Sequence, residues 1–124
     1  MNTFVNCLLV GAGGMVGTIG RYLLGLLPIK AQSGFPIITL GINLIGAFCI
    51  GLIVAFSTRS GNTNPQLVLF LKVGICGGFT TFSTFSLEAM QLLQNGKLVV
   101  ALSYMILSVA LCVAAVAGAQ AIVK

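Results

Sequence analysis

The chain has 124 residues, of which 58% are hydrophobic and only 6% are charged, and its formal net charge is +5. This composition excludes a soluble globular domain and indicates an all-α integral membrane protein with a single domain, residues 1–124. The basic residues flank apolar runs, where they suit lipid headgroups better than nucleic acid. Four runs are long enough to cross a bilayer as helices, approximately residues 4–27, 35–57, 66–94 and 98–122.

The first run, residues 4–27, is rich in glycine. It lacks a basic leading segment and a small-residue cleavage site, so we expect a retained span rather than a signal peptide. Gly13 and Gly17 form a GxxxG pair, which in a membrane allows two helix backbones to approach closely. Arg21 lies in the second half of this run and is either a headgroup anchor or part of an entry vestibule.

The second run, residues 35–57, places Thr39 and Asn43 one helical turn apart on one face. An amide deep in a span is costly to expose to lipid, so Asn43 either bridges helices or faces a water-filled site. The two interpretations have equal support from the sequence. The run also carries Gly41, Gly46 and Gly51, which favour tight helix packing.

The third run, residues 66–94, contains the sequence GGFTTFSTF from Gly77 to Phe85. Gly77 lies about 16 Å into the run at 1.5 Å per residue, close to the middle of a bilayer. Glycine and threonine both disfavour a helix, so we predict a break, with the first half ending near Gly77 and the second starting near Thr81. A packing kink is the alternative, but it would not need the hydroxyl groups that follow.

A broken helix exposes two ends of opposite polarity. The carbonyl groups of the first half suit a small cation, whereas the N–H groups of the second half suit an anion. Phe82 and Phe85 lie three residues apart on the second half, beside Ser83 and Thr84. The positive edges of their rings are able to hold an anion without a fixed charge, although phenylalanine in a span is more often a core or lipid-facing residue.

Glu88, near the end of residues 66–94, is the only acidic residue of the chain. It either pairs with a lysine or a polar group at the vestibule or is a protonatable site, and its position near the end of the run favours the interfacial interpretation. The fourth run, residues 98–122, has Tyr104 and Ser108 one turn apart, at a depth similar to that of Thr39 and Asn43. These side chains predict a polar lane between the helices.

Small residues recur in the last two spans as well: a second GxxxG pair, Gly74 and Gly78, and a row of Ala110, Ala114 and Gly118. We expect both to support close helix packing. All of the cysteines lie within predicted spans, without metal-ligand spacing, so we interpret them as packing residues rather than disulfides or metal ligands: Cys7, Cys49, Cys76 and Cys112.

The basic residues give no orientation bias. The side that holds both termini has Arg59, Lys72 and Lys124, and the opposite side has Arg21, Lys30 and Lys97. Because an excess of Lys and Arg normally fixes which loops stay in the cytoplasm, this chain is expected to insert both ways and to form an antiparallel homodimer. Chance balance among few charges is the alternative. Lys72, like Arg21, is either a headgroup anchor or part of a vestibule.

Three motifs resemble the Fluc (CrcB) family of bacterial fluoride channels: GGFTTFSTF, LGINLIGAF in the second run, and GGMVGTIGRY in the first. The resemblance covers all four runs, and Thr18 stands where an alanine is often found. It implies a dual-topology homodimer in the bacterial cytoplasmic (inner) membrane, with two separate pathways that export fluoride passively and reduce its toxicity.

The resemblance also implies roles for individual residues. The ring edges of two phenylalanines and the amide of one asparagine would face fluoride, beside a track of hydroxyl groups: Phe82, Phe85, Asn43, Ser83, Thr84, Thr39 and Tyr104. The backbone carbonyls of Gly77 and Thr80 from both subunits would hold a structural sodium ion. The reasoning from the residues alone reaches the broken helix, the cation-suited carbonyls and the antiparallel pair, but not fluoride.

Two other functions are weighed against a channel. A proton-coupled multidrug transporter with four spans needs an acid in the first span, and residues 4–27 contain none. A non-conducting structural subunit would leave the alternation of hydroxyls and phenylalanines unexplained. An enzyme is not expected, because the chain has no histidine and no pair of carboxylates for acid–base or nucleophilic chemistry.

Overall fold

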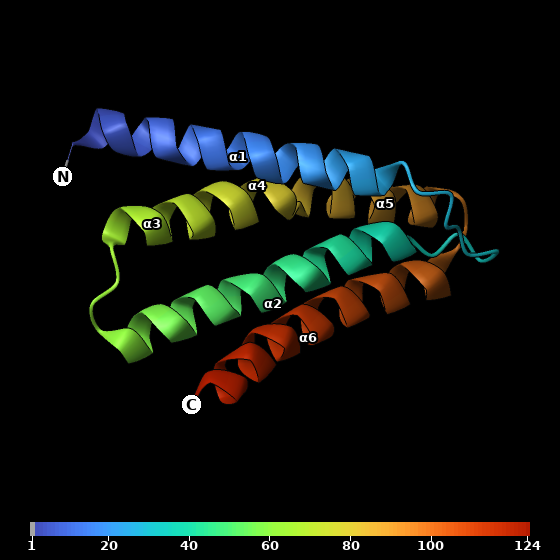
Figure 1. Cartoon of the computed structure of the whole chain (residues 1–124). Helices are drawn as coiled ribbons and strands as arrows, with labels where there is room; N and C mark the ends of the chain where they lie inside the picture. Colours follow the sequence, from blue (N-terminus) through green and yellow to red (C-terminus); the bar gives the residue numbers. More distant parts are fainter. Residues whose placement is uncertain (1) are drawn as a thin grey trace.

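The structure is a computed structural model that describes residues 2–124. Within these residues, four helical stretches are long and apolar enough to cross a membrane: Thr3–Gly25, Ile37–Ser60, Pro65–Gln94 and Leu98–Val123. They run up and down side by side, so the start of the first and the end of the last lie at the same end of the molecule (Figure 1). The prediction of four spanning helices is confirmed, and the chain is a multi-pass membrane protein.

The first two helices begin and end at residues with local reasons to do so. α1 (Thr3–Gly25) starts after Asn2, whose side-chain oxygen accepts a hydrogen bond from the backbone N–H of Phe4 at 2.9 Å. α2 (Ile37–Ser60) ends at Gly61, which has φ of 65°, the left-handed conformation that glycine adopts without steric cost. α2 therefore extends three residues beyond the predicted end at residue 57.

The third span is built from four short elements: α3 (Pro65–Leu69), the π-helical segment η1 (Phe70–Cys76), α4 (Gly77–Phe79) and α5 (Phe82–Gln94). Between α4 and α5, Thr80 and Thr81 are extended, with ψ of 160° and 123°. The predicted end of the first half near Gly77 is wrong by two residues, because Gly77 and Gly78 stay helical. The π-helical segment was not expected.

Glycine backbones hold α1 against the first half of the third span. A Cβ atom added at Gly13 would lie 2.7 Å from the carbonyl oxygen of Phe70, and one added at Gly78 would lie 2.6 Å from the carbonyl oxygen of Gly14. No side chain fits at these positions, so the predicted close helix packing is confirmed for both GxxxG pairs, and the structure shows that the two pairs face each other. This contact also explains why Gly78 remains helical: its backbone is fixed by α1.

α6 (Leu98–Val123) packs along α2 and, near its start, against α5. The predicted small-residue row of α6 is not the face that α2 touches, since a Cβ at Gly118 would meet no atom within 4 Å. Instead, a Cβ at Gly51 of α2 would lie 2.9 Å from the Cβ of Ala119. The buried residues of α6 include Tyr104, Ser108 and Ala119, and none of the buried residues belongs to the predicted row.

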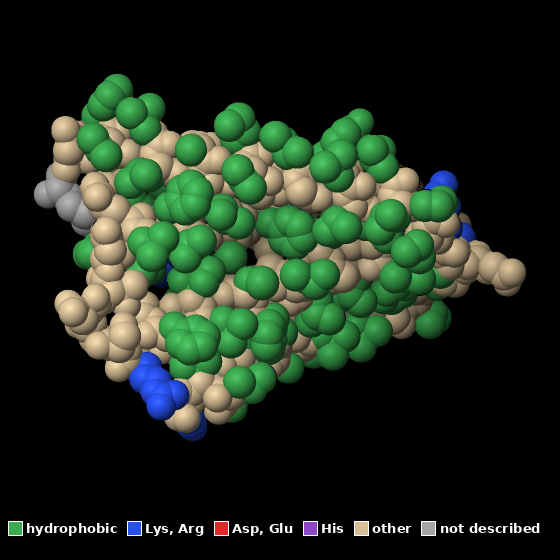
Figure 2. Space-filling view, in the orientation of Figure 1, with side chains coloured by type: hydrophobic (Ala, Val, Ile, Leu, Met, Phe, Trp, Pro, Cys, Tyr) green, Lys and Arg blue, Asp and Glu red, His purple; other side chains and the backbone are tan. Residues whose placement is uncertain are grey.

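The surface is apolar over most of its area. Figure 2 shows hydrophobic side chains over the helices on one face, with Lys and Arg toward the two ends of the molecule. Large side chains from every span are exposed, among them Phe4, Phe56, Phe82 and Ile106. An apolar surface of this extent needs lipid or another protein chain to cover it.

Candidate functional site

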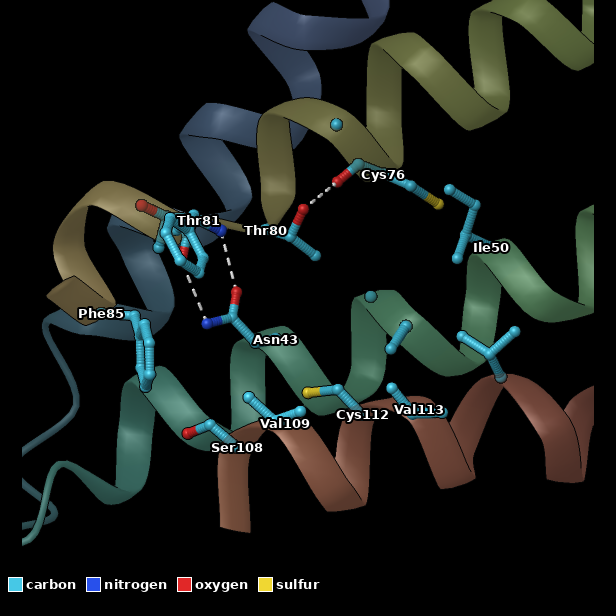
Figure 3. Close-up of a pocket in the computed structure, with 15 residues that line it drawn as sticks. Asn43, Ile50, Cys76, Thr80, Thr81, Phe85, Ser108, Val109, Cys112 and Val113 are labelled. Carbon is cyan, nitrogen blue, oxygen red and sulfur yellow. Dashed lines mark hydrogen bonds between the residues drawn. The ribbon is translucent and has the colours of Figure 1, made fainter. Parts of the chain in front are cut away.

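The break in the third span is held by one side chain from α2. The amide nitrogen of Asn43 donates to the carbonyl oxygen of Thr81 at 3.1 Å, and its amide oxygen accepts from the N–H of Thr81 at 2.8 Å (Figure 3). Asn43 thus satisfies both backbone groups of an extended residue that has no helical partner, as backbone inside a membrane requires. Of the two interpretations of Asn43, the bridging one is observed, and the second N–H of the amide remains for another acceptor.

The two threonines of the break cap the helices on either side of it. The hydroxyl of Thr80 donates to the carbonyl oxygen of Cys76 at 2.9 Å, in the last turn of the first half. The hydroxyl of Thr81 accepts from the N–H of Thr84 at 3.1 Å and so caps the start of α5. The hydroxyl groups that the sequence places after the glycines therefore stabilise the two new helix ends.

These contacts release two carbonyl groups from the helical ladder. In an unbroken helix the N–H of Thr81 would donate to the carbonyl of Gly77, and the N–H of Thr84 to the carbonyl of Thr80. The first N–H is bonded to Asn43 instead, and the second to the hydroxyl of Thr81. Gly77 and Thr80 also line a common groove. Carbonyl oxygens without a helical donor are ligands of the kind that small hard cations take.

Arg21 of α1 contacts the end of the first half-helix, a role that sequence reasoning missed. Its Nε donates to the carbonyl oxygen of Gly78 at 3.1 Å, and the hydroxyl of Thr18 donates to the same oxygen at 3.4 Å. A cation is favourable at the negative end of a helix. The depth of Arg21 within an apolar run was the available signal, but the sequence does not reveal its partner 57 residues away.

A groove of about 460 Å³ runs beside the break, between the third span, α2 and α6. Its walls are mostly apolar, and it includes one buried hydroxyl, that of Ser108, which has no hydrogen-bond partner among residues 2–124. Asn43 and Thr81 lie at one side of it and Cys112 at the other (Figure 3). All four cysteines are free thiols.

The two phenylalanines of α5 differ in environment although they are neighbours. Their ring centroids lie 5.5 Å apart, and both residues line the groove. Phe85 is 9% exposed and its ring lies 5.0 Å from that of Tyr104, whereas Phe82 is 78% exposed. One ring is therefore fixed by the core, and the other projects from the surface of the single chain.

Glu88 is bound by side chains from two other spans. Its carboxylate accepts from the hydroxyl of Thr39 on α2 at 2.9 Å and from the hydroxyl of Tyr104 on α6 at 2.9 Å. Thr39 and Tyr104 are buried and Glu88 is partly buried, so the carboxylate pairs with polar groups of two neighbouring helices. The predicted interfacial depth of Glu88 stays a prediction. The polar partner is a pair of hydroxyls and not a lysine.

The predicted site residues therefore fall into three groups. Asn43, Phe82 and Phe85 share the groove; Thr39 and Tyr104 bind Glu88; and Ser83 and Thr84 belong to the first turn of α5. The hydroxyl of Ser83 lies 3.5 Å from that of Thr81, beside the break. We call the hydroxyl residues of the break, of α5 and of the two helices that bind Glu88 the polar line: Thr81, Ser83, Thr84, Thr39 and Tyr104.

The sequence is similar to a well-defined set of proteins. Residues 8–120 match the family model described as "CrcB-like protein, Camphor Resistance (CrcB)". A protein of Ruminiclostridium cellulolyticum named "Fluoride-specific ion channel FluC" is 45% identical over 100% of this chain and 96% of its own length. A protein of the same name from Rhizobium meliloti is 42% identical over 94% of this chain and 94% of its own length. A protein of Yersinia pestis named "Fluoride-specific ion channel FluC 1" is 45% identical over 86% of this chain and 84% of its own length.

Proposed function

We propose, from the premise that this chain belongs to the CrcB-like protein family, that it is a fluoride-selective ion channel of a bacterial cytoplasmic membrane. Fluoride would leave the cell passively, down its electrochemical gradient, which would reduce its toxicity. The relatives are named as ion channels, and the chain is not an enzyme.

The groove beside the broken helix is the observation that carries this proposal. It brings together an amide that is held in place, Asn43, and a pair of aromatic rings, Phe82 and Phe85, at the start of α5. The second N–H of the amide and the positive ring edges are weak donors for an anion, and the positive end of α5 adds to them. Several weak sites in series permit an ion to enter and to leave.

Selectivity for fluoride would follow from size and hydration. Fluoride is small and strongly hydrated, so a pathway must replace its water with short contacts to several donors. Ser83 and Thr84 would supply hydroxyl donors along the polar line that leads away from Phe85, and Thr39 and Tyr104, whose hydroxyl protons are donated to Glu88, would lie beside the pathway. A lane that is narrow enough for such contacts would reject larger halides.

The groove is open along one side, which supports a second copy of the chain as its missing wall. Phe82 projects outward from the same side of the break and would contact that copy. The equal division of basic residues between the two ends supports an antiparallel arrangement. We therefore infer a dual-topology homodimer with two equivalent pathways.

A sodium ion would bind where the two copies meet. The carbonyl oxygens of Gly77 and Thr80, released from the helix as described above, would hold it together with the same two groups of the second copy. The ion would supply fixed positive charge that holds the broken helices of the two copies together. Among residues 2–124 no cluster of His, Cys, Asp and Glu offers a competing metal site.

Fluoride efflux from liposomes that contain the purified protein, read with a fluoride electrode, tests the proposed function. We expect rapid efflux of fluoride, no efflux of chloride, and loss of fluoride efflux in the double variant Phe82→Ile, Phe85→Ile. Lack of fluoride efflux from well-folded wild-type protein would refute the channel and favour the structural-subunit interpretation.

The finer parts of the proposal need separate measurements. Chemical cross-linking in membranes would report the homodimer, and labelling of a single introduced cysteine from each side of the membrane, in a chain whose native cysteines are replaced, would report dual topology. Replacement of sodium by N-methylglucamine should weaken the dimer. If the dimer is equally stable without sodium, the sodium site is wrong even where efflux remains.

A further inference from the structure

The peptide unit between Thr80 and Thr81 is held by α2. Its N–H, which belongs to Thr81, donates to the amide oxygen of Asn43 at 2.8 Å (Figure 3). Residues 2–124 contain no cis peptide bond, and in a planar trans peptide the C=O points opposite to the N–H. The carbonyl oxygen of Thr80 therefore points away from Asn43, in a direction that this hydrogen bond fixes.

The side chain of Thr80 contacts α2 as well, at Gly46, three residues beyond Asn43. A Cβ atom added at Gly46 would overlap the γ-methyl group of Thr80, so this methyl occupies the space that a side chain would need. The next two neighbours of the added atom would be a ring carbon of Phe79 at 3.4 Å and the Cβ of Thr80 at 3.6 Å. These are ordinary contact distances, so the methyl group alone requires glycine at residue 46.

The hydroxyl of Thr80 fixes the direction of that methyl group. It donates to the carbonyl oxygen of Cys76 at 2.9 Å, and the backbone N–H of Thr80 donates to the same oxygen at 3.0 Å. Hydroxyl and methyl are attached to the same carbon atom, so they rotate together about χ1. A rotation that moved the methyl away from Gly46 would break the bond of the hydroxyl to Cys76.

Thr80 is thus held on both sides of its carbonyl group. We infer that Gly46 is a positioning residue for the Thr80 carbonyl as a sodium ligand: the bare backbone of Gly46 admits the Thr80 methyl, and this contact, together with Asn43, aims the carbonyl. The inference rests on the sodium site proposed above. Residues that orient the ligands of a metal site without touching the ion typically change its affinity about tenfold or more when they are replaced.

The sodium requirement of the dimer tests this role. Energy transfer between copies labelled at their N-termini reports dimers in detergent, while sodium replaces N-methylglucamine at constant ionic strength. Gly46→Ala should raise the sodium concentration for half-maximal dimer about tenfold. Adding Thr80→Ser, which removes the methyl but keeps the hydroxyl and the carbonyl, should restore the wild-type value. Gly41→Ala, the same change on the same helix where a Cβ meets no atom within 4 Å, should leave it unaltered.

A sodium requirement that Gly46→Ala leaves unchanged, or that Thr80→Ser does not restore, would overturn the inference while the sodium site stands. Lower thermal stability of Gly46→Ala in N-methylglucamine, with an unchanged sodium requirement, would assign Gly46 a packing role alone. A wild-type dimer that does not respond to sodium would refute the sodium site and this inference with it. If Gly46→Ala does not fold, the double variant decides: folded protein with the wild-type sodium requirement supports the inference, and a second failure to fold contradicts it.

Discussion

The two halves of the third span are held in place by different kinds of contact. The first half, Pro65–Phe79, packs its backbone directly on α1, most closely at Gly74 and Gly78, where an added Cβ atom would lie 3.0 and 2.6 Å from the backbone of α1. The second half, Phe82–Gln94, is held by side-chain hydrogen bonds, from the cap of Thr81 to the carboxylate of Glu88. Backbone contacts tolerate no substitution, whereas hydrogen bonds can be weakened one at a time.

This contrast has a physical basis in the task of each half. The first half must bring its terminal carbonyls to a fixed position, and the backbone contact with α1 defines that position, with Arg21 and Thr18 of α1 donating to the carbonyl of Gly78. The second half presents hydroxyls and rings along the polar line, and its hydrogen bonds orient these side chains. The following substitutions test the contrast in order of decreasing effect.

Substitution of Gly17 by valine should have the largest effect. A Cβ at Gly17 would overlap the carbonyl oxygen of Ile75, so α1 and η1 would have to separate. We expect a loss of stability of about 3 kcal/mol or more and little folded protein. Unfolding in mixed micelles with increasing denaturing detergent measures this. Gly11→Ala is the matched control, because a Cβ there meets no atom within 4 Å, and it should be neutral.

Asn43→Leu should cause the second largest loss of stability, because it removes both hydrogen bonds to Thr81. The backbone N–H and C=O of Thr81 would then lack partners inside the bundle, at a cost of about 2 kcal/mol. The same unfolding measurement should show this loss, and fluoride efflux should fall as the break loses its orientation. An Asn43→Leu variant with unchanged stability would show that the break does not depend on this amide.

Thr81→Val should have a smaller effect, because it removes one helix cap and preserves the shape of the side chain. The N–H of Thr84 loses its acceptor, which costs about 1 kcal/mol. Thr81→Ser keeps the hydroxyl and should restore most of the stability. If serine and valine destabilise equally, the methyl group and not the cap is responsible.

Glu88→Gln should have the smallest effect of the four. An amide has both an acceptor and a donor, and the hydroxyls of Thr39 and Tyr104 can act as either, so both contacts can persist with a loss of about 0.5 kcal/mol. Fluoride efflux should remain, which liposome assays would show. Complete loss of efflux in a stable Glu88→Gln protein would revive the proton-coupled interpretation.

Structural features that depend on residues near each other in the sequence were predicted correctly. Apolar runs gave the four spans, and the consecutive glycines and threonines indicated the break to within two residues. The GxxxG pairs predicted close helix packing, which the structure shows between α1 and the first half of the third span. Each of these features depends on composition or spacing within one helix, which the sequence states directly.

The hydrogen-bond partners that polar side chains find on other helices were not predicted. The sequence left Asn43 between two interpretations, left the partner of Glu88 open, and gave Arg21 no partner. Each answer depends on the rotation of one helix about its axis relative to another. The small-residue row of α6 shows this dependence, because Gly118 meets no neighbour while Ala119 packs against Gly51.

The sequence by itself determined that the chain crosses a membrane four times and that the third crossing is interrupted, because hydrophobicity and helix propensity are local properties. Tertiary structure decided which groups of other helices stabilise the interruption. An extended backbone inside an apolar bundle must find hydrogen-bond partners. The hydroxyls of Thr80 and Thr81 act within the third span, whereas Asn43 and Arg21 reach the break only when the helices are assembled.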